Sequence, residues 1–337
     1  MHLARFPRRR YTPAPTPLEP LPRLSEHLGG PEIWIKRDDL LGLAAGGNKT
    51  RKLEFLVADA LAQGADTLIT VGAVQSNHCR LTLAAAAKEG LRCRLLLEER
   101  VPGSYDPKGT GNNFLFELLG AEAIRVLPAG ADLAQALQAE ADAVSAEGRR
   151  AYVIPGGGSN PRGALGYAAC AEEILGQTFQ LGLPLDAIVC TSGSAGTHAG
   201  LLVGLTGSDA QIPLSGISVR RPQAEQEALV HGLAGRTSEL LGASTAVARE
   251  DVVVHDEWVG PGYAIPTDEM VDAVRLLARL EGVLLDPVYT GKTMAGLIGL
   301  IGRGAWEKGQ RVLFLHTGGS PALYAYQGVL SDGHGRS

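Results

Sequence analysis

The chain has 337 residues, enough for one large domain or two linked domains with a substantial core. Its 31 Lys and Arg are balanced by 36 Asp and Glu, and this formal net charge of −5 argues against nucleic acid or an anionic membrane as a partner. The basic N-terminus is followed by YTPAPTP rather than an apolar stretch, so we expect no signal peptide. No apolar run reaches the roughly 18–20 residues of a membrane span. Four scattered cysteines without a C-x-x-C pair exclude a disulfide framework, predict no metal site and favour a cytoplasmic protein.

Short apolar segments alternate with helical patterns along almost the whole chain. The predicted strands are 33–37, 67–73, 92–99, 123–128, 151–157, 187–193, 214–220, 283–287 and 311–319. The predicted helices are 48–64, 76–90, 131–148, 163–177 and 267–282. Continuously apolar strands separated by helices of this length are typical of parallel sheets with helices on both faces. The predicted fold class is therefore α/β, with two such units and a crossing between them near 155–163.

The first candidate motif is GGNKTRKLEF at 46–55, where two glycines lead into a helix. Lys49 and Lys52 are three residues apart and share a helix face. An ammonium group at a helix N-terminus opposes the helix dipole, which lowers its pKa and favours the neutral amine that imine formation requires. The alternative is a solvated, basic helix start.

The second motif is GAVQSNH at 72–78, at the carboxyl end of a predicted strand. Ser76 and Asn77 lie where a helix N-cap belongs, and strand ends are also where open α/β sheets bind ligands. Gln75 and His78 extend the run to four hydrogen-bonding side chains, more than a cap needs. A binding function is therefore favoured over capping alone.

The third motif is TSGSAGTHAG at 191–200, again between a strand and a helix. Small residues expose successive backbone N–H groups, and the following helix adds its positive end, so the segment predicts an anion-binding loop. It lacks the G-K-[ST] of a P-loop and the spacing of a dinucleotide-binding fingerprint, which argues against a kinase or a dehydrogenase. The alternative is a tight turn between a strand and a helix.

Hydroxyl groups follow two further predicted strands. Tyr289 and Thr290 lie in DPVYTGKTMAG at 286–296, and Thr317 lies in HTGGSPALYAY at 316–326. Tyr263 lies in the Gly/Pro segment GPGYAIP and is interpreted as a contact residue, although a packed ring is the alternative. The cysteines are interpreted as small buried hydrophobic residues, with Cys79 as the one that could line a site.

An imine-forming lysine, an anion loop and hydroxyls at several strand ends together suggest pyridoxal 5′-phosphate as the cofactor. Lys49 is then expected to bind the aldehyde as a Schiff base, with Lys52 as a countercharge to the phosphate. Thr317 is expected to meet the pyridine nitrogen, and a neutral partner there favours elimination over transamination. The expected phosphate loop consists of Ser192, Gly193, Ser194, Ala195, Gly196 and Thr197.

The chain resembles the D-cysteine desulfhydrase and 1-aminocyclopropane-1-carboxylate (ACC) deaminase family of fold-type II pyridoxal-phosphate enzymes. The resemblance covers nearly the whole chain, from FPRRRYTPAPTPLEPLPRLS through IWIKRDDL, GGNKTRKLEF, GAVQSNH, IPGGGSN, GALGY, SGSAGTHAG and LLDPVYTGK to HTGGSPALYAY. It implies a fold like the β subunit of tryptophan synthase, with a large domain of residues 1–49 and 161–337 and a smaller inserted domain of residues 50–160. It also implies a cofactor in the cleft between the domains and a homodimer.

Residue by residue, the resemblance makes Lys49 the lysine that binds the cofactor. Ser76 becomes the nucleophile or proton carrier, and Asn77 binds the phenolic oxygen of the cofactor. Tyr263 and Tyr289 match the two tyrosines that position the substrate and move protons. The small amino-acid substrate is expected to contact Ser76, Asn77, His78, Tyr263 and Tyr289.

Thr290 separates the branches of the family, because the ACC deaminase pattern D-P-V-Y-E-G-K has a glutamate where this chain has Thr290. The expected reaction is therefore α,β-elimination of D-cysteine to pyruvate, sulfide and ammonia, with Lys49 or the tyrosine pair as the base. L-Cysteate sulfo-lyase, which releases sulfite, is the main alternative, and ACC deaminase or a non-catalytic cofactor-binding protein is less favoured. The sequence leaves open the chirality of the substrate and whether sulfide, sulfite or chloride leaves.

Overall fold

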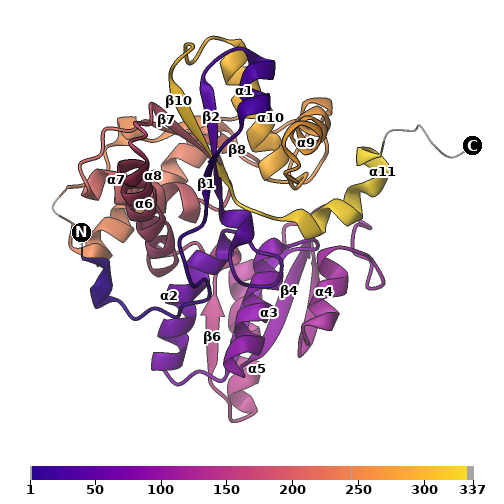
Figure 1. Ribbon diagram of the computed structural model, residues 1–337. Coiled ribbons are helices and arrows are strands. Elements are labelled where there is room, and N and C mark those ends of the chain that lie inside the picture. Colours follow the sequence, from indigo (N-terminus) through magenta and orange to yellow (C-terminus); the bar gives the residue numbers. More distant parts are fainter. Residues whose placement is uncertain (1, 244, 332–337) are drawn as a thin grey trace, which may run out of the picture.

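The computed structural model describes residues 2–243 and 245–331, which form two sheets flanked by helices (Figure 1). The larger sheet has six strands in the order β1-β2-β10-β7-β8-β9. Its strands are parallel except that β1 runs antiparallel to β2. The bounds of its strands are β1 Leu18–Pro20, β2 Glu32–Arg37, β7 Ala187–Ser192, β8 Leu214–Ser218, β9 Val253–His255 and β10 Arg311–His316.

The smaller sheet has four parallel strands in the order β5-β4-β3-β6. All four come from one continuous stretch of the chain, whereas the larger sheet combines the N-terminal segment with strands that follow residue 186. The bounds of its strands are β3 Thr67–Ala73, β4 Arg92–Glu99, β5 Ala123–Pro128 and β6 Ala151–Ile154.

Helices cover both faces of each sheet. In Figure 1, α6, α7 and α8 lie on one side of the larger sheet and α9 and α10 on the other, while α2 to α5 surround the smaller sheet. The bounds of the helices are α1 Pro22–Leu28, α2 Lys49–Ala62, α3 Asn77–Glu89, α4 Asn112–Leu118, α5 Leu133–Ala146, α6 Pro161–Leu181, α7 Gly196–Gly207, α8 Gln223–Leu241, α9 Asp268–Glu281, α10 Thr290–Gly302 and α11 Gln327–Leu330. None of the helices in the described part of the chain combines the length and apolar character that crossing a membrane requires.

The central strands are buried on both faces, as their continuous apolar character predicts. In β7, Ile188 and Cys190 pack against the helices on one side, while Ala187 and Val189 pack against those on the other. Every second side chain of a strand points to the same face, so two cores form on one sheet. This arrangement confirms the predicted α/β class.

The predicted strand at 283–287 is wrong. Val283 and Leu285 are buried in the core, but the segment pairs with no strand among the described residues. Instead, the Asp286 carboxylate accepts hydrogen bonds from the backbone N–H groups of Val288, Tyr289 and Thr290. The chain therefore turns into α10, and apolar burial alone did not distinguish this turn from a strand.

Other predicted boundaries shift, and several elements were not predicted. The predicted strands at 151–157, 187–193, 214–220 and 311–319 end one to three residues earlier than expected. Helix α10 was not predicted because it is rich in glycine, which has a low helix propensity. In the structure, Gly296 and Gly299 permit close contact with Ile217 and Trp258. The other unpredicted elements are β1, β9, α1, α4, α8 and α11.

The carboxyl ends of strands from both sheets point toward one region. Helix α3 begins after β3, helix α7 begins after β7, and Thr317 follows β10. Helices α2 and α10 also begin there, because Lys49 and Tyr289 line the same pocket as these strand ends. Several helix N-termini, with the positive ends of their dipoles, therefore surround one space.

Candidate active site

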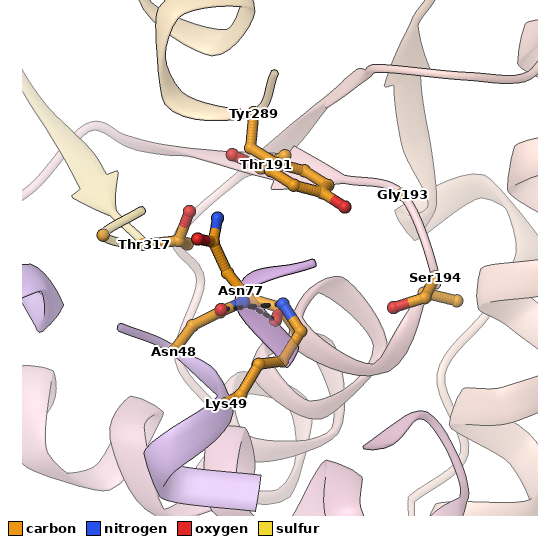
Figure 2. A pocket seen from close by; sticks show the side chains of 11 residues that line it. Asn48, Lys49, Asn77, Thr191, Gly193, Ser194, Tyr289 and Thr317 are labelled. Carbon is orange, nitrogen blue, oxygen red and sulfur yellow. Dashed lines mark hydrogen bonds between the residues drawn. The ribbon is translucent and has the colours of Figure 1, made fainter. Parts of the chain in front are cut away.

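The pocket is formed by residues that lie far apart in the sequence (Figure 2). Its lining offers amines, amides and hydroxyls, and no carboxylate lines it among the residues that the structure describes. Such a lining suits an anionic ligand with acceptor oxygens. The lining residues are Asn48, Lys49, Asn77, Thr191, Gly193, Ser194, Ala195, Thr197, Tyr289, Thr317 and Gly318.

Lys49 is the first residue of α2, and its side chain extends into the pocket (Figure 2). Its Nζ donates to Asn48 Oδ1 at 2.8 Å and lies 5.7 Å from the centroid of the Tyr289 ring. Burial lowers the pKa of Lys49 to about 8; the Asp286 carboxylate opposes this shift and the charge of Arg80 adds to it. Roughly a tenth of the amine is therefore neutral at pH 7, which allows it to attack a carbonyl.

The loop between β7 and α7 forms the anion-binding side of the pocket. Gly193, Ser194, Ala195 and Thr197 all line it, and α7 begins at Gly196. Ala195 has φ +72°, a left-handed conformation that costs an alanine about 1–2 kcal/mol. Ala195 lines the pocket, and backbone strain retained at such a position is typical of a functional site.

Lys52 lies one turn after Lys49 and approaches the same loop from behind the lining. Its Nζ donates to Gly157 O at 3.1 Å and to Ser159 Oγ at 3.3 Å, and a Cβ on Gly196 would lie 2.8 Å from it. Burial, and then the charge of Lys49, hold the pKa of Lys52 well below its ordinary value. An anion bound at the loop would favour the protonated form of Lys52.

Ser192 was predicted in the phosphate loop, but the structure places its side chain in the core. Ser192 Oγ accepts from Gln226 Nε2 at 2.9 Å and shares a 3.1 Å hydrogen bond with His198 Nδ1. Ser192 is fully buried and does not line the pocket. Ser192 is the last residue of β7, and its side chain points into the core rather than into the pocket. The geometry therefore does not support the prediction that Ser192 belongs to the phosphate loop.

Of the QSNH residues, Asn77 lines the pocket and its neighbours do not. Ser76 Oγ accepts from Cys79 N at 3.1 Å, which confirms the predicted cap of α3. His78 Nε2 shares a 2.8 Å hydrogen bond with Thr70 Oγ1, so its ring faces β3. The contacts predicted between these two side chains and a substrate stay predictions.

Cys79 does not line the pocket either. Its side chain is fully buried in the core around α3, and burial raises the pKa of its thiol to about 12. The other three cysteines are also buried and free, which confirms that they act as small hydrophobic residues.

Tyr289 and Tyr263 form a pair beside the start of the loop, where a Cβ on Gly193 would lie 3.8 Å from the Tyr289 ring. Their hydroxyls share a short hydrogen bond, and their rings meet edge to face with centroids 5.9 Å apart. Tyr289 lines the pocket, whereas Tyr263 lies behind it with the Arg100 guanidinium 4.5 Å from its ring centroid. Lys292 fixes the segment before Tyr263, because its Nζ donates to Val259 O at 2.6 Å and to Gly262 O at 2.9 Å.

Thr317, the predicted partner of the ring nitrogen, and Thr290, which separates the family branches, have different surroundings. Thr317 lines the pocket close to Asn77 (Figure 2). Thr290 is fully buried, and its Oγ1 accepts from Asp286 N at 2.7 Å and donates to Asp286 Oδ1 at 2.8 Å. Thr290 therefore stabilises the start of α10 and offers no carboxylate to the pocket.

Several pocket residues were not predicted individually. Asn48 Nδ2 donates to Thr197 Oγ1 at 2.9 Å, and Thr191 Oγ1 shares a 2.7 Å hydrogen bond with Thr293 Oγ1. Asn48 and Thr191 both lie inside predicted motifs, so the signal was present. Arg80 and Arg100 lie outside the sequence motifs that were singled out above. Only the packing of the folded chain brings these two arginines near the pocket.

The comparisons with known proteins agree with this geometry. The sequence profile of the family described as "Pyridoxal-phosphate dependent enzyme" matches residues 10–318. Two relatives named D-cysteine desulfhydrase, from Salmonella typhimurium strain LT2 and from Salmonella typhi, are each 50% identical over 326 residues, covering 96% of this chain and 98% of the relative.

Solved structures show the same fold. The crystal structure of an ACC deaminase homologue has a TM-score of 0.88 at 38% identity and covers 97% of this chain and 96% of its own. O-ureido-L-serine synthase has a TM-score of 0.67 at 19% identity, covering 96% of this chain and 95% of its own, a likeness of fold alone.

The pocket fits the cofactor of that family. The Lys49 amine has a lowered pKa, the strained loop that leads into α7 lines the pocket at a helix N-terminus, and the lining carries donors without an opposing carboxylate among the described residues. The chain belongs to the family of pyridoxal-phosphate dependent enzymes, and pyridoxal 5′-phosphate is its cofactor.

Proposed function

We propose that the protein is a D-cysteine desulfhydrase, which converts D-cysteine and water to pyruvate, sulfide and ammonia by α,β-elimination. The observation that carries the proposal is the pocket centred on Lys49, in a chain that is 50% identical to the D-cysteine desulfhydrase of Salmonella typhimurium. The bound cofactor supplies an electron sink that makes the α-proton of an amino acid removable and allows the β-substituent to leave.

The residues of this chain hold that cofactor at four points. Lys49 would bind its aldehyde, and the loop 193–197 would bind its phosphate, with the Lys52 ammonium as countercharge. Asn77 would donate to its phenolic oxygen, and the Thr317 hydroxyl would be the partner of its ring nitrogen. Because a threonine hydroxyl does not hold the ring nitrogen protonated, the site favours elimination over transamination.

Proton movement falls to Lys49 and the tyrosine pair. Lys49 Nζ lies near the Tyr289 ring, and the Tyr289 hydroxyl is hydrogen-bonded to that of Tyr263. Burial raises the pKa of both tyrosines, so both hydroxyls keep their protons near neutral pH and can donate to a departing group. In this arrangement Lys49 is the base for the α-proton, and the tyrosine pair protonates the leaving sulfur. Ser76, at the start of α3, is a proton carrier of secondary importance because its hydroxyl does not line the pocket.

A second candidate is L-cysteate sulfo-lyase, and the arginines near Tyr263 favour it. The Arg100 guanidinium stacks on the Tyr263 ring, and the charges of Arg100 and Arg221 add to burial in lowering the pKa of Arg220. Arginines gathered beside the tyrosine pair suit a substrate whose β-substituent is a sulfonate. The ACC deaminase alternative has no such support, because Thr290 is hydrogen-bonded to Asp286.

The test measures pyruvate and sulfide together after D-cysteine is added to the cofactor-loaded enzyme. Lys49→Ala, loaded in the same way, is the blank, because free cysteine also reacts with the cofactor. Pyruvate and sulfide in equal amounts support the desulfhydrase. No turnover with D-cysteine, combined with pyruvate and sulfite from L-cysteate, would replace it with the sulfo-lyase. Cofactor binding without turnover of either substrate would favour a non-catalytic protein.

We further propose a cytoplasmic homodimer with two domains per chain. The larger domain consists of residues 1–49 and 161–337, and the smaller one of residues 50–160, so that the pocket lies between them. The proposal is supported by the origin of the smaller sheet in one continuous stretch of chain. Light scattering that yields the mass of one chain would contradict the dimer.

A further inference from the structure

Arg80 is a buried cation whose hydrogen-bond acceptors carry no charge. It lies on α3, one turn after Asn77, and is fully buried. In the described part of the chain its acceptors are Asn77 Oδ1 at 2.9 Å, Asn112 Oδ1 at 2.8 Å and Gly46 O at 2.8 Å, and its Nε has no partner. Burial lowers the pKa of Arg80 to about 10, and the Asp286 carboxylate opposes this shift through its charge without accepting a hydrogen bond from Arg80. A buried cation that donates only to neutral acceptors is costly, so its presence calls for a role beyond stability.

The hydrogen bonds of Arg80 fix the orientation of two side-chain amides. A guanidinium only donates, so both Asn77 and Asn112 must turn their oxygens toward it. Asn112 Nδ2 then donates to Gln75 O and to Asn77 Oδ1, each at 2.9 Å. Asn77 Oδ1 therefore accepts two hydrogen bonds. A flipped Asn77 amide would point its NH₂ group at the N–H donors of Arg80 and Asn112, so the observed orientation is fixed.

The same network places the donor of Asn77 in the pocket. Asn77 Nδ2 donates to no protein acceptor among the described residues, and Asn77 lines the pocket. Gly319 lies directly beside this nitrogen, and a Cβ there would approach it to 2.7 Å. The Asn77 amide consequently presents two hydrogens to whatever acceptor oxygen occupies the pocket.

Arg80 also joins the segments that carry the two pocket residues. Its Nη2 bonds Gly46, three residues before Lys49, while its Nη1 bonds Asn77 at the start of α3. Gly46 has φ +68°, and a Cβ there would lie 1.7 Å from Asp39 O, so this turn has little freedom to move. The guanidinium therefore sets the distance between the amine and the amide of the pocket.

We propose that Arg80 is a positioning residue for the cofactor: through the Asn77 side chain it keeps an N–H donor directed at the phenolic oxygen, and its positive charge favours the ionised form of that oxygen. The inference depends on the cofactor and not on the identity of the substrate. It remains testable if D-cysteine proves not to be the substrate.

The experiment is a double-mutant cycle on cofactor affinity, with Arg80→Met, Asn77→Ala and the double variant. Arg80→Met is expected to weaken binding of pyridoxal 5′-phosphate about tenfold, since it removes charge-assisted hydrogen bonds that hold Asn77. In the Asn77→Ala background the same change is expected to cost less than about twofold. An equal loss in both backgrounds, or no loss in either, would overturn the proposal.

A second measurement is the pH titration of the visible absorbance of the holoenzyme. Arg80→Met is expected to move the midpoint upward by about one pH unit, because it removes a cation and a donor that stabilise the deprotonated cofactor. Arg51→Met is the matched control, since Arg51 is also a buried arginine but lies on α2 and pairs with Asp38 and Glu173. Arg51→Met is expected to leave the midpoint in place, with Arg51→Lys compared with Arg80→Lys if it does not fold, and a shift equal to that of the Arg80 variant would contradict a specific role.

If Arg80→Met does not fold, as judged by circular dichroism, Arg80→Lys takes its place in the cycle. Lysine keeps the charge, but a single ammonium group cannot reproduce the planar arrangement in which the guanidinium donates to Asn77, Asn112 and Gly46. A smaller loss of cofactor affinity that again vanishes in the Asn77→Ala background supports the proposal. A loss of the same size in both backgrounds overturns it.

Discussion

Two neighbouring parts of the pocket wall, called here the loop end and the tyrosine end, are built in different ways, and Gly193 and Tyr289 adjoin where they meet. At the loop end, small residues of the β7–α7 connection form the surface, and the start of a regular helix fixes them. At the tyrosine end, large side chains come from an irregular segment and from the start of α10, and Arg100 and Lys292 hold them in place. The loop end is suited to holding a constant group, whereas the tyrosine end can differ between substrates. Binding of the cofactor and turnover of the substrate should therefore respond to different substitutions.

The largest effect is expected where both functions meet, at Lys49. Lys49→Ala should lower turnover by about 10⁴-fold or more, because no other amine lines the described pocket. Measured pyruvate formation checks this, and the circular dichroism spectrum should match that of the unaltered protein. Pyruvate formation within tenfold of the unaltered rate would contradict the role of Lys49.

At the tyrosine end, Tyr289→Phe should lower kcat about a hundredfold, as expected for the loss of a proton donor, with little change in cofactor affinity. Tyr263→Phe is the matched variant, and a smaller effect is expected because Tyr263 lies behind the lining. If Tyr289→Phe weakened cofactor binding more than it lowered kcat, the distinction between the two ends would fail.

At the loop end, Lys52→Met should weaken cofactor affinity about 10- to 100-fold, because the phosphate loses a charge-assisted partner. Turnover at saturating cofactor should change by only a few fold. Equilibrium dialysis and steady-state kinetics measure the two quantities separately. A fall in kcat with unchanged affinity would place Lys52 in the chemistry instead.

The rate at which the apoenzyme takes up the cofactor should depend on pH. The reactive form of Lys49 is the neutral amine, and its pKa is lowered to about 8. Uptake should therefore rise about tenfold per pH unit below pH 8 and level off above it. Stopped-flow absorbance measures the rate. A rise that continues to pH 10 would show that the pocket does not lower the proton affinity of Lys49.

The smallest effect is expected for Ala195→Gly. Ala195 has φ +72°, so glycine relieves strain but gains freedom in the unfolded chain, and the net change in the free energy of unfolding should be a stabilisation of up to about 1 kcal/mol. Chemical denaturation of the apoenzyme measures it. Destabilisation by more than this amount would mean that the loop depends on the alanine methyl group.

Much of the site could be predicted because local signals mark it. Lys49, Asn77 and the loop 193–197 each follow a strand or a glycine turn and precede a helix, and the residue types of a cap or an anion loop are readable without tertiary contacts. The same local reasoning could not tell which side of a buried strand or helix start faces the pocket, and the side chains of Ser192 and His78 make their hydrogen bonds elsewhere.

The sequence by itself determined the α/β class, the starts of α2, α3 and α7 and the choice of cofactor, because strand burial and helix capping are encoded by neighbouring residues. Only the tertiary structure decided that 283–287 turns instead of pairing, that Tyr263 lies behind Tyr289 and that Arg80 orients Asn77. Those outcomes depend on hydrogen bonds and packing between segments far apart in the chain. Apolar patterning, which repeats over a few residues, carries no information about them.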